Sequence, residues 1–127
     1  KYTGEWVDNK MSGKGILYYI DDKIAYDGQW RDDRLWGYGV LFNEDPKILD
    51  RPYDYRSWDD VDEYWIRYEG SFVDDNKDGR GKLFLSNGEV FEGWFQNDYV
   101  TGEGTFHRND GKVVRGVWKN NQLVEQY

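Results

Sequence analysis

The feature that most constrains the fold is a five-residue pattern, aromatic–x–Gly–x–aromatic, that returns along the chain. Residues 2–6, 26–30, 68–72 and 91–95 carry it, and a weaker copy with valine in place of the first ring lies at 114–118. The central glycines are 24, 42, 23 and 23 residues apart. Self-similarity at such a period indicates a repeat protein, in which each unit buries its apolar face only against its neighbours.

A second pattern, Gly–x–Gly–x–apolar, follows each of the first four copies. Its first glycine always comes nine residues after the glycine of the first pattern, and its apolar residues are Leu17, Leu41, Leu83 and Phe106. A period of two places the rings and glycines of a strand on one face. A bare glycine between two rings leaves room for a neighbour's ring to lie over it.

Polar segments between the patterns predict the turns. Residues 8–12 and 96–99 indicate a turn inside a unit, and Asn87-Gly88 and Asp110-Gly111 indicate tight two-residue turns between units. Each unit is therefore expected to be strand, turn, strand, turn. A single hairpin cannot bury a face alone, so the units are expected to stack into a ribbon.

The stretch from Tyr68 to Gly88 resembles the MORN (membrane occupation and recognition nexus) consensus, and the resemblance covers residues 1–42 and 68–118. It implies an all-β fold: an elongated, twisted antiparallel sheet of about five stacked hairpins with a grooved face. The fifth unit lacks its Gly–x–Gly. We expect one domain, 1–127, with units near 1–25, 26–42 (followed by an insertion at 43–67), 68–90, 91–113 and, in part, 114–127.

The insertion at 43–67 breaks the period and has its own composition. It holds eight acidic and four basic residues, which gives half of the chain's net charge of −8, together with five large rings. Ser57 followed by Asp60 predicts a capped short helix, whereas the alternation from Tyr64 to Phe72 predicts that the segment ends in a lengthened strand. The rings either fold back over the ribbon or contact a ligand directly.

Several chemistries are disfavoured. The net charge argues against nucleic acid and against anionic membranes, both of which select Lys and Arg. There is no cysteine, and one histidine, His107, makes a nucleophile–base relay hard to assemble. Residues 74–79 copy only the first half of a calcium loop, because Leu85 stands where the bidentate Glu is needed. Rings beside carboxylates also occur in sugar sites, but here the rings follow the repeat. We expect no catalytic residue, no metal and no cofactor.

The resemblance implies peptide or protein binding, self-association and lipid contact. We therefore expect a non-catalytic, cytoplasmic scaffold, at the cytoskeleton or the membrane periphery, whose ring-lined groove and acidic insertion hold a basic or amphipathic peptide, a helix or a second copy. Two alternatives stay open: a phospholipid-targeting module, and the regulatory arm of an enzyme, such as a protein methyltransferase or lipid kinase, whose catalytic domain lies outside this chain. The candidate partner-binding residues are Tyr53, Tyr55, Trp58 and Trp65 of the insertion, and Trp6, Trp30, Phe72, Phe95 and Trp118 of the repeats.

Overall fold

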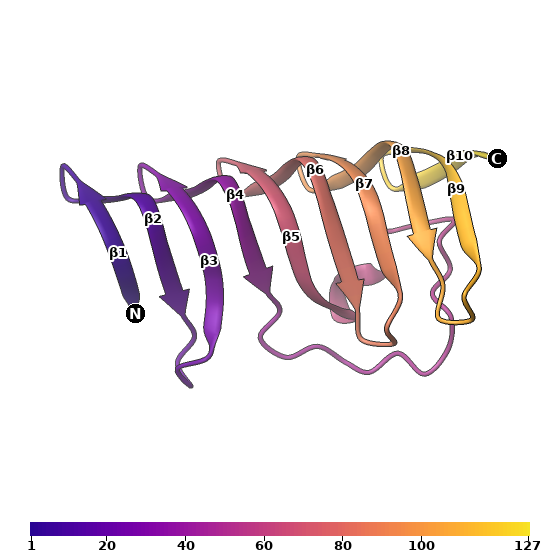
Figure 1. The fold of residues 1–127 in the computed structure, drawn as a ribbon, viewed down its shortest axis with the longest axis horizontal. Coiled ribbons are helices and arrows are strands. Elements are labelled where there is room, and N and C mark those ends of the chain that lie inside the picture. Colours follow the sequence, from indigo (N-terminus) through magenta and orange to yellow (C-terminus); the bar gives the residue numbers. More distant parts are fainter.

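The computed structural model describes all 127 residues, as one open antiparallel sheet of ten strands. The strands lie in the sheet in chain order, so each hairpin stacks on the next and the molecule is elongated (Figure 1). The expected architecture of stacked hairpins is therefore confirmed. The strands are β1 Tyr2–Val7, β2 Lys10–Tyr18, β3 Ile24–Arg31, β4 Arg34–Phe42, β5 Trp65–Val73, β6 Asn76–Leu85, β7 Val90–Gln96, β8 Tyr99–His107, β9 Val113–Lys119 and β10 Gln122–Gln126.

A row of paired glycines crosses the sheet from β1 to β9. Each glycine lies opposite the next in the ladder: Gly4, Gly15, Gly28, Gly39, Gly70, Gly81, Gly93, Gly104 and Gly116. A ring from the first strand of a hairpin covers the glycine of its second strand, so that a Cβ on Gly81 would overlap the ring of Tyr68. The prediction placed a neighbour's ring over the glycine that lies between two rings. The structure instead places the ring over the facing glycine of the second pattern, because the ring leans across the ladder from the first strand to the second. We call the face that carries this row and the rings the inner face.

The rings of the inner face form one continuous edge-to-face chain. Within it, Tyr26 contacts Trp30 of its own unit at 5.2 Å between centroids and Phe72 of the next unit at 5.4 Å. Edge-to-face pairs of this kind are favourable because the positive ring edge meets the negative ring face. The chain therefore links the first strand of each unit to the first strand of the next unit. Its members are Trp6, Tyr2, Trp30, Tyr26, Phe72, Tyr68, Phe95, Phe91 and Trp118.

The turns inside the units are two residues long, and both residues of each have positive φ. This is the type I′ geometry that matches the twist of a hairpin, and Asn and Asp tolerate the left-handed conformation well. The polar segments predicted as turns are thus turns over two residues only, because Lys10 and Tyr99 already begin strands. The five pairs are Asp8–Asn9, Asp32–Asp33, Asp74–Asp75, Asn97–Asp98 and Asn120–Asn121.

The turns between units are longer than predicted. At residues 86–88, the Leu85 N–H donates to the Glu89 carbonyl at 2.9 Å and the Gly88 N–H donates to the Leu85 carbonyl at 3.1 Å. Only the third loop residue, Gly88, has positive φ. The loops at 20–22 and 109–111 have the same pattern. The prediction of two-residue turns at Asn87-Gly88 and Asp110-Gly111 was wrong, because these glycines serve three-residue loops instead.

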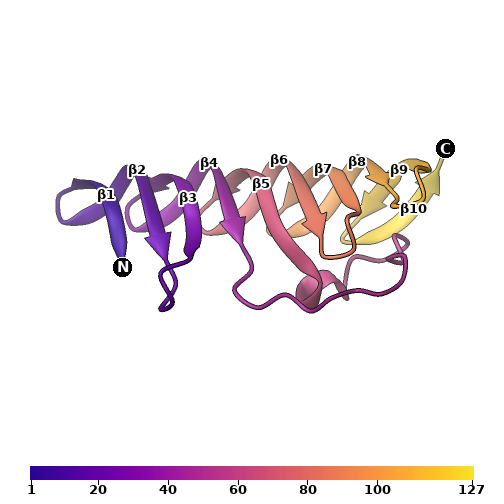
Figure 2. The ribbon, with the colours of Figure 1, turned by 60° about the horizontal axis from the view of Figure 1, so that its bottom comes forward.

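The insertion leaves β4, runs along the ends of the following strands as far as the last hairpins, and returns to β5 (Figures 1 and 2). The predicted capped helix is wrong: the only helical turn is a 3₁₀ turn at Val61–Glu63, and no side chain caps it. β5 begins at Trp65 and is the longest first strand of any unit, as the alternation predicted. No helix in the molecule is long and apolar enough to cross a membrane.

A candidate partner-binding face of the sheet

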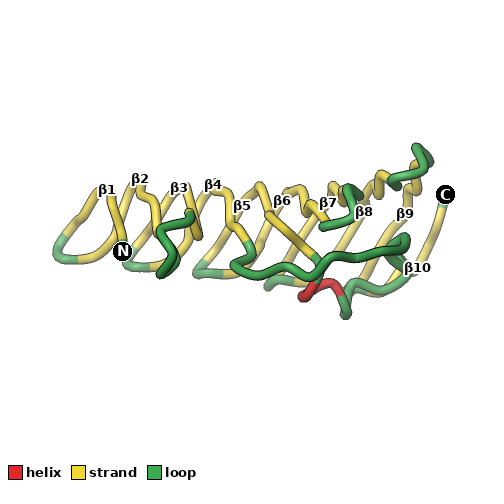
Figure 3. Tube along the Cα trace, turned by 90° about the horizontal axis from the view of Figure 1, so that it is seen from below, coloured by secondary structure: helices red, strands yellow, loops and turns green.

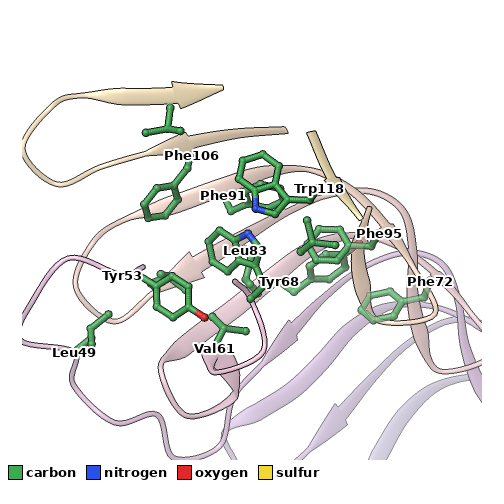
Figure 4. Packing of buried hydrophobic residues seen from close by; sticks show 14 of the residues in the cluster. Leu49, Tyr53, Val61, Tyr68, Phe72, Leu83, Phe91, Phe95, Phe106 and Trp118 are labelled. Atoms are coloured by element: carbon green, nitrogen blue, oxygen red, sulfur yellow. The ribbon is translucent and has the colours of Figure 1, made fainter. Parts of the chain in front are cut away.

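Part of the insertion packs against the inner face of the C-terminal half of the sheet, and Figure 4 shows Tyr53 among the buried side chains of β6–β9. Trp58 is only 2% exposed; its ring stacks on Tyr53 at 4.7 Å and contacts Phe91 at 4.9 Å and Phe106 at 5.4 Å. Tyr53 and Trp58 are therefore part of the hydrophobic core. For these two rings, the first of the alternatives holds, because they fold back and cover the ribbon.

A buried carboxylate anchors the insertion to the loops between units. Glu89 is fully buried, and its Oε1 accepts the Tyr53 N–H at 2.8 Å and the Asn87 Nδ2–H at 2.6 Å. Its Oε2 accepts the Asn109 N–H at 3.3 Å. Burying a carboxylate is costly unless N–H donors replace its hydration, and here three do so. The path of the insertion is thus tied to two loops that lie far from it in sequence.

An acidic cleft of about 330 Å³ stays open between the returning insertion and the turn ends of β6–β8. Lys77 lies in it, with Nζ at 4.0 Å from Asp98 Oδ1 and at 5.4 Å from the centroid of the Trp65 ring. Burial lowers the pKa of Lys77, while the nearby carboxylates of Asp98 and Asp62 oppose this shift. The carboxylates of Asp59, Asp62 and Asp98 outnumber the single ammonium group of Lys77, so the cleft favours a cationic ligand. Its polar and aromatic lining includes Asp59, Asp62, Trp65, Lys77, Asp98 and Tyr99.

The same face is uncovered over β1–β4. The insertion departs after β4 and lies over the later strands only (Figure 3). Five apolar side chains of this half pack against the core yet remain half-buried: Tyr2, Met11, Leu17, Leu35 and Leu41. We call this surface the open groove.

The candidate residues from the repeats divide into four buried rings and one exposed ring. Trp6 is 57% exposed, whereas its counterparts Trp30, Phe72, Phe95 and Trp118 are at most 4% exposed. Each of these four is covered by a ring of the preceding unit, whereas Trp6 lies in β1, the first of the ten strands. These four rings pack beneath the surface of the inner face, and almost none of their own surface is accessible to a partner.

The candidate residues from the insertion also divide. Tyr53 and Trp58 are buried, while Tyr55 and Trp65 are half-buried and keep part of their surface open. Tyr55 also accepts the Trp118 Nε1–H at its carbonyl oxygen, at 2.8 Å. The structure thus brings Tyr53, Tyr55, Trp58 and Trp118 together and leaves Trp6 at the other end. Sequence reasoning missed the open groove, although Leu17 and Leu41 stand at the apolar position of the second pattern.

The histidine and the calcium-loop-like segment noted in the sequence lie on strands and turns of the sheet. His107 is exposed at the end of β8. Asp74 lies in a type I′ turn, and Asn76 and Asp78 belong to β6. No group of three or more His, Asp or Glu side chains is arranged to hold a metal ion.

Comparison with known proteins agrees with the hairpin architecture. A family model described as MORN repeat matches residues 2–23, 26–43 and 68–90, which lie in the first three units of the sheet. A search of curated proteins returned no match. Repeats of this kind are generally associated with membrane or protein binding. With three matching segments and five stacked hairpins, the chain belongs to the MORN-repeat proteins.

Proposed function

We propose that the protein is a non-catalytic, cytoplasmic scaffold that holds an extended, basic or amphipathic peptide segment on its inner face. The observation that carries this proposal is the insertion, which is itself an extended aromatic segment seated on that face. It is held by ring stacking from Trp58 and by backbone N–H donation from Tyr53. The chain therefore contains an example of the kind of ligand that the repeat surface accepts.

The open groove offers equivalent positions to a ligand from outside. Leu17 and Leu41 pair across the ladder with Tyr26, as Leu83 pairs with Phe91 beneath the insertion. A segment with rings or aliphatic side chains would bury these half-exposed groups, and each Å² of apolar area removed from water contributes about 25 cal/mol. Basic residues are favoured because the insertion has a net charge of −4 and the whole chain a net charge of −8.

A synthetic peptide with the sequence of residues 49–58 and the changes Asp50→Lys and Asp54→Lys tests the proposal. It should shift the methyl NMR signals of Leu17, Leu35 and Leu41, and Leu17→Ser should weaken binding by about tenfold, equivalent to 1.4 kcal/mol. Tyr38→Ser is the matched control, because Tyr38 lies on the opposite face and is 57% exposed. Absence of groove shifts, or equal affinity for the unaltered peptide, in which two Asp balance two Arg, would contradict the proposed recognition.

Anionic lipid binding is a second candidate, supported by one basic patch on this acidic protein. Arg31 and Arg34 lie directly opposite each other across the hairpin. Lys10 and the 39%-exposed Trp36 line the same hollow, together with Asp32 and Asp74, so that three basic side chains face two acidic ones. Like charges in such a pair repel unless an anion neutralises them. Vesicles with and without phosphatidylserine test this candidate by co-sedimentation. Salt-sensitive pelleting that is abolished by Arg31→Glu with Arg34→Glu would favour it over peptide binding.

A further inference from the structure

The insertion is not needed to hold β4 and β5 together. Residues 37–42 pair with residues 67–72 without a break in register, and the Asn43 N–H donates to the Ile66 carbonyl at 3.0 Å just beyond this ladder. Apart from one isolated bridge, the insertion adds nothing to the ladders of the ten-stranded sheet. Much shorter loops make the same connection between the other units. The insertion can therefore leave the inner face while all ten strands stay paired.

The repeats bury most of their own rings without help from the insertion. Tyr26 in the uncovered half is as fully buried as Phe91 beneath the insertion, because rings of its own and the next unit surround it. What the insertion changes is the apolar position of the second pattern. Leu83 is 3% exposed beneath it, whereas Leu41 in the open groove is half-buried. Release of the insertion would thus leave a surface of the same kind as the open groove.

Between residues 49 and 58, the insertion contacts the sheet largely through its own backbone. The Leu49 N–H donates to Ser86 Oγ at 2.9 Å, and the Tyr53 N–H donates to Glu89 Oε1 at 2.8 Å. Three carbonyl groups of the insertion accept N–H groups of the sheet, and they belong to Arg51, Tyr55 and Arg56. Any polypeptide offers such groups, so specificity depends on the buried side chains of Leu49, Tyr53 and Trp58.

The hydrogen bonding of Trp58 is incomplete in the covered state. Its side chain is only 2% exposed, yet its indole N–H is buried without a hydrogen-bond acceptor. A donor buried in this way loses the hydrogen bond that it would form with water. The indole N–H therefore favours release of the insertion, and the apolar contacts of the ring oppose it.

We propose that the inner face over β6–β9 is a second binding surface, for a polypeptide segment with the spacing Leu–x–x–x–Tyr–x–x–x–x–Trp, and that the insertion is its resident intramolecular ligand. An external segment of this kind binds there by displacing the insertion. The inference rests on the proposed function for the kind of ligand, and it adds what regulates this part of the face. A tethered segment competes at an effective concentration of about millimolar, so the insertion excludes weak ligands.

The probe is a synthetic peptide with the sequence of residues 49–60, added to the isotope-labelled full chain in which Trp58→Ala loosens the insertion. We expect the peptide to shift the methyl signals of Leu83 and Val100, which line the acidic cleft together with Trp58. It should bind this variant at least about tenfold more tightly than the parent, whose own insertion competes for the surface. The same peptide carrying Trp58→Ala should bind at least about tenfold more weakly, because it lacks the indole ring.

A second loosened variant keeps the test independent of one substitution. Tyr53→Ala removes the ring that stacks on Trp58 at 4.7 Å but leaves Trp58 in place, and it should also admit the peptide. Trp94→Ala is the matched control, because Trp94 is 45% exposed on the opposite face, and this variant should bind the peptide as the parent does. A dispersed amide spectrum shows that each variant is folded.

The position of the shifts separates this inference from the proposed function. Equal affinity for the parent and the loosened variants overturns the inference, as does the absence of shifts at Leu83 and Val100 in a folded variant up to about 2 mM peptide. Shifts confined to Leu17, Leu35 and Leu41 also overturn it, while supporting recognition in the open groove. Shifts at Leu83 and Val100 without any in the open groove support the inference and count against that recognition.

Discussion

The inner face over β1–β4 and the inner face over β6–β9 are built from the same repeat but have different coverings. Leu17 and Leu41 are half-buried in the first half, whereas Leu83 and Phe106, at the same position of the pattern, are at most 3% exposed in the second. The repeat decides which groups face inward. At this position of the pattern, the insertion decides whether a side chain becomes core or remains surface, and it covers only the second half. The ring position is buried in both halves, since Tyr26 and Phe91 are both 0% exposed.

The largest expected effect comes from filling the glycine row beneath a buried ring. A Cβ at Gly81 would collide with the fully buried Tyr68, which cannot move aside. Gly81→Val should therefore lower the free energy of unfolding by about 4 kcal/mol. Gly15→Val meets Tyr2, which is half-exposed and can swing outward, so about 2 kcal/mol is expected there. Urea unfolding measures both; equal losses would show that the two halves are equally rigid.

The next effect compares two tryptophans, one from each half. Trp58→Ala should cost about 3 kcal/mol, because it opens a cavity against Tyr53, Phe91 and Phe106. Trp6→Ala should change stability by less than about 0.5 kcal/mol, because that ring is already largely exposed. Thermal unfolding of the two variants checks the pair. A large loss of stability for Trp6→Ala would mean that the side chain of Trp6 is more tightly packed than its exposure indicates.

A smaller loss of stability is expected when the contact between Glu89 and the insertion is weakened. Glu89→Gln keeps the shape but turns an amide donor toward at least one of the N–H groups that now donate to the carboxylate, at a cost of about 1–2 kcal/mol. Hydrogen exchange should quicken at the Tyr53 N–H and remain unchanged in β2 and β3. Faster exchange throughout the sheet would show that the anchor stabilises both halves together.

The smallest effect concerns Lys77, which occupies the position that Met11 holds in the first unit. Its pKa is lowered in the folded state, mainly by burial, so the charged form is penalised below the folded pKa and the penalty vanishes above the unfolded value of about 10.4. Lys77→Met should raise Tm by about 2 °C at pH 7 and give no gain near pH 11. A gain that is independent of pH would assign the effect to packing instead.

The hairpins, the glycine row and the rings that cover it could be read from the sequence, because they depend on short spacings and nearest neighbours. The turn types could not. Asn87-Gly88 satisfies a two-residue turn and a three-residue loop equally well by composition, and the ladder at Leu85 and Glu89 decides between them. The insertion was harder still: a helix at Ser57 was the local expectation, yet residues 56–58 pair with β10.

The sequence by itself determined which side chains share a face, because the period of two and the fixed glycine spacing act locally in every unit. Only the tertiary structure decided which half of that face is covered and which sheet edge is closed. The contacts responsible join residues far apart in the chain, such as Tyr53 to Glu89, Tyr55 to Trp118 and Arg56 to Leu123. No periodic pattern in the sequence predicts these contacts, because the insertion occurs only once and each of its contacts is formed only once.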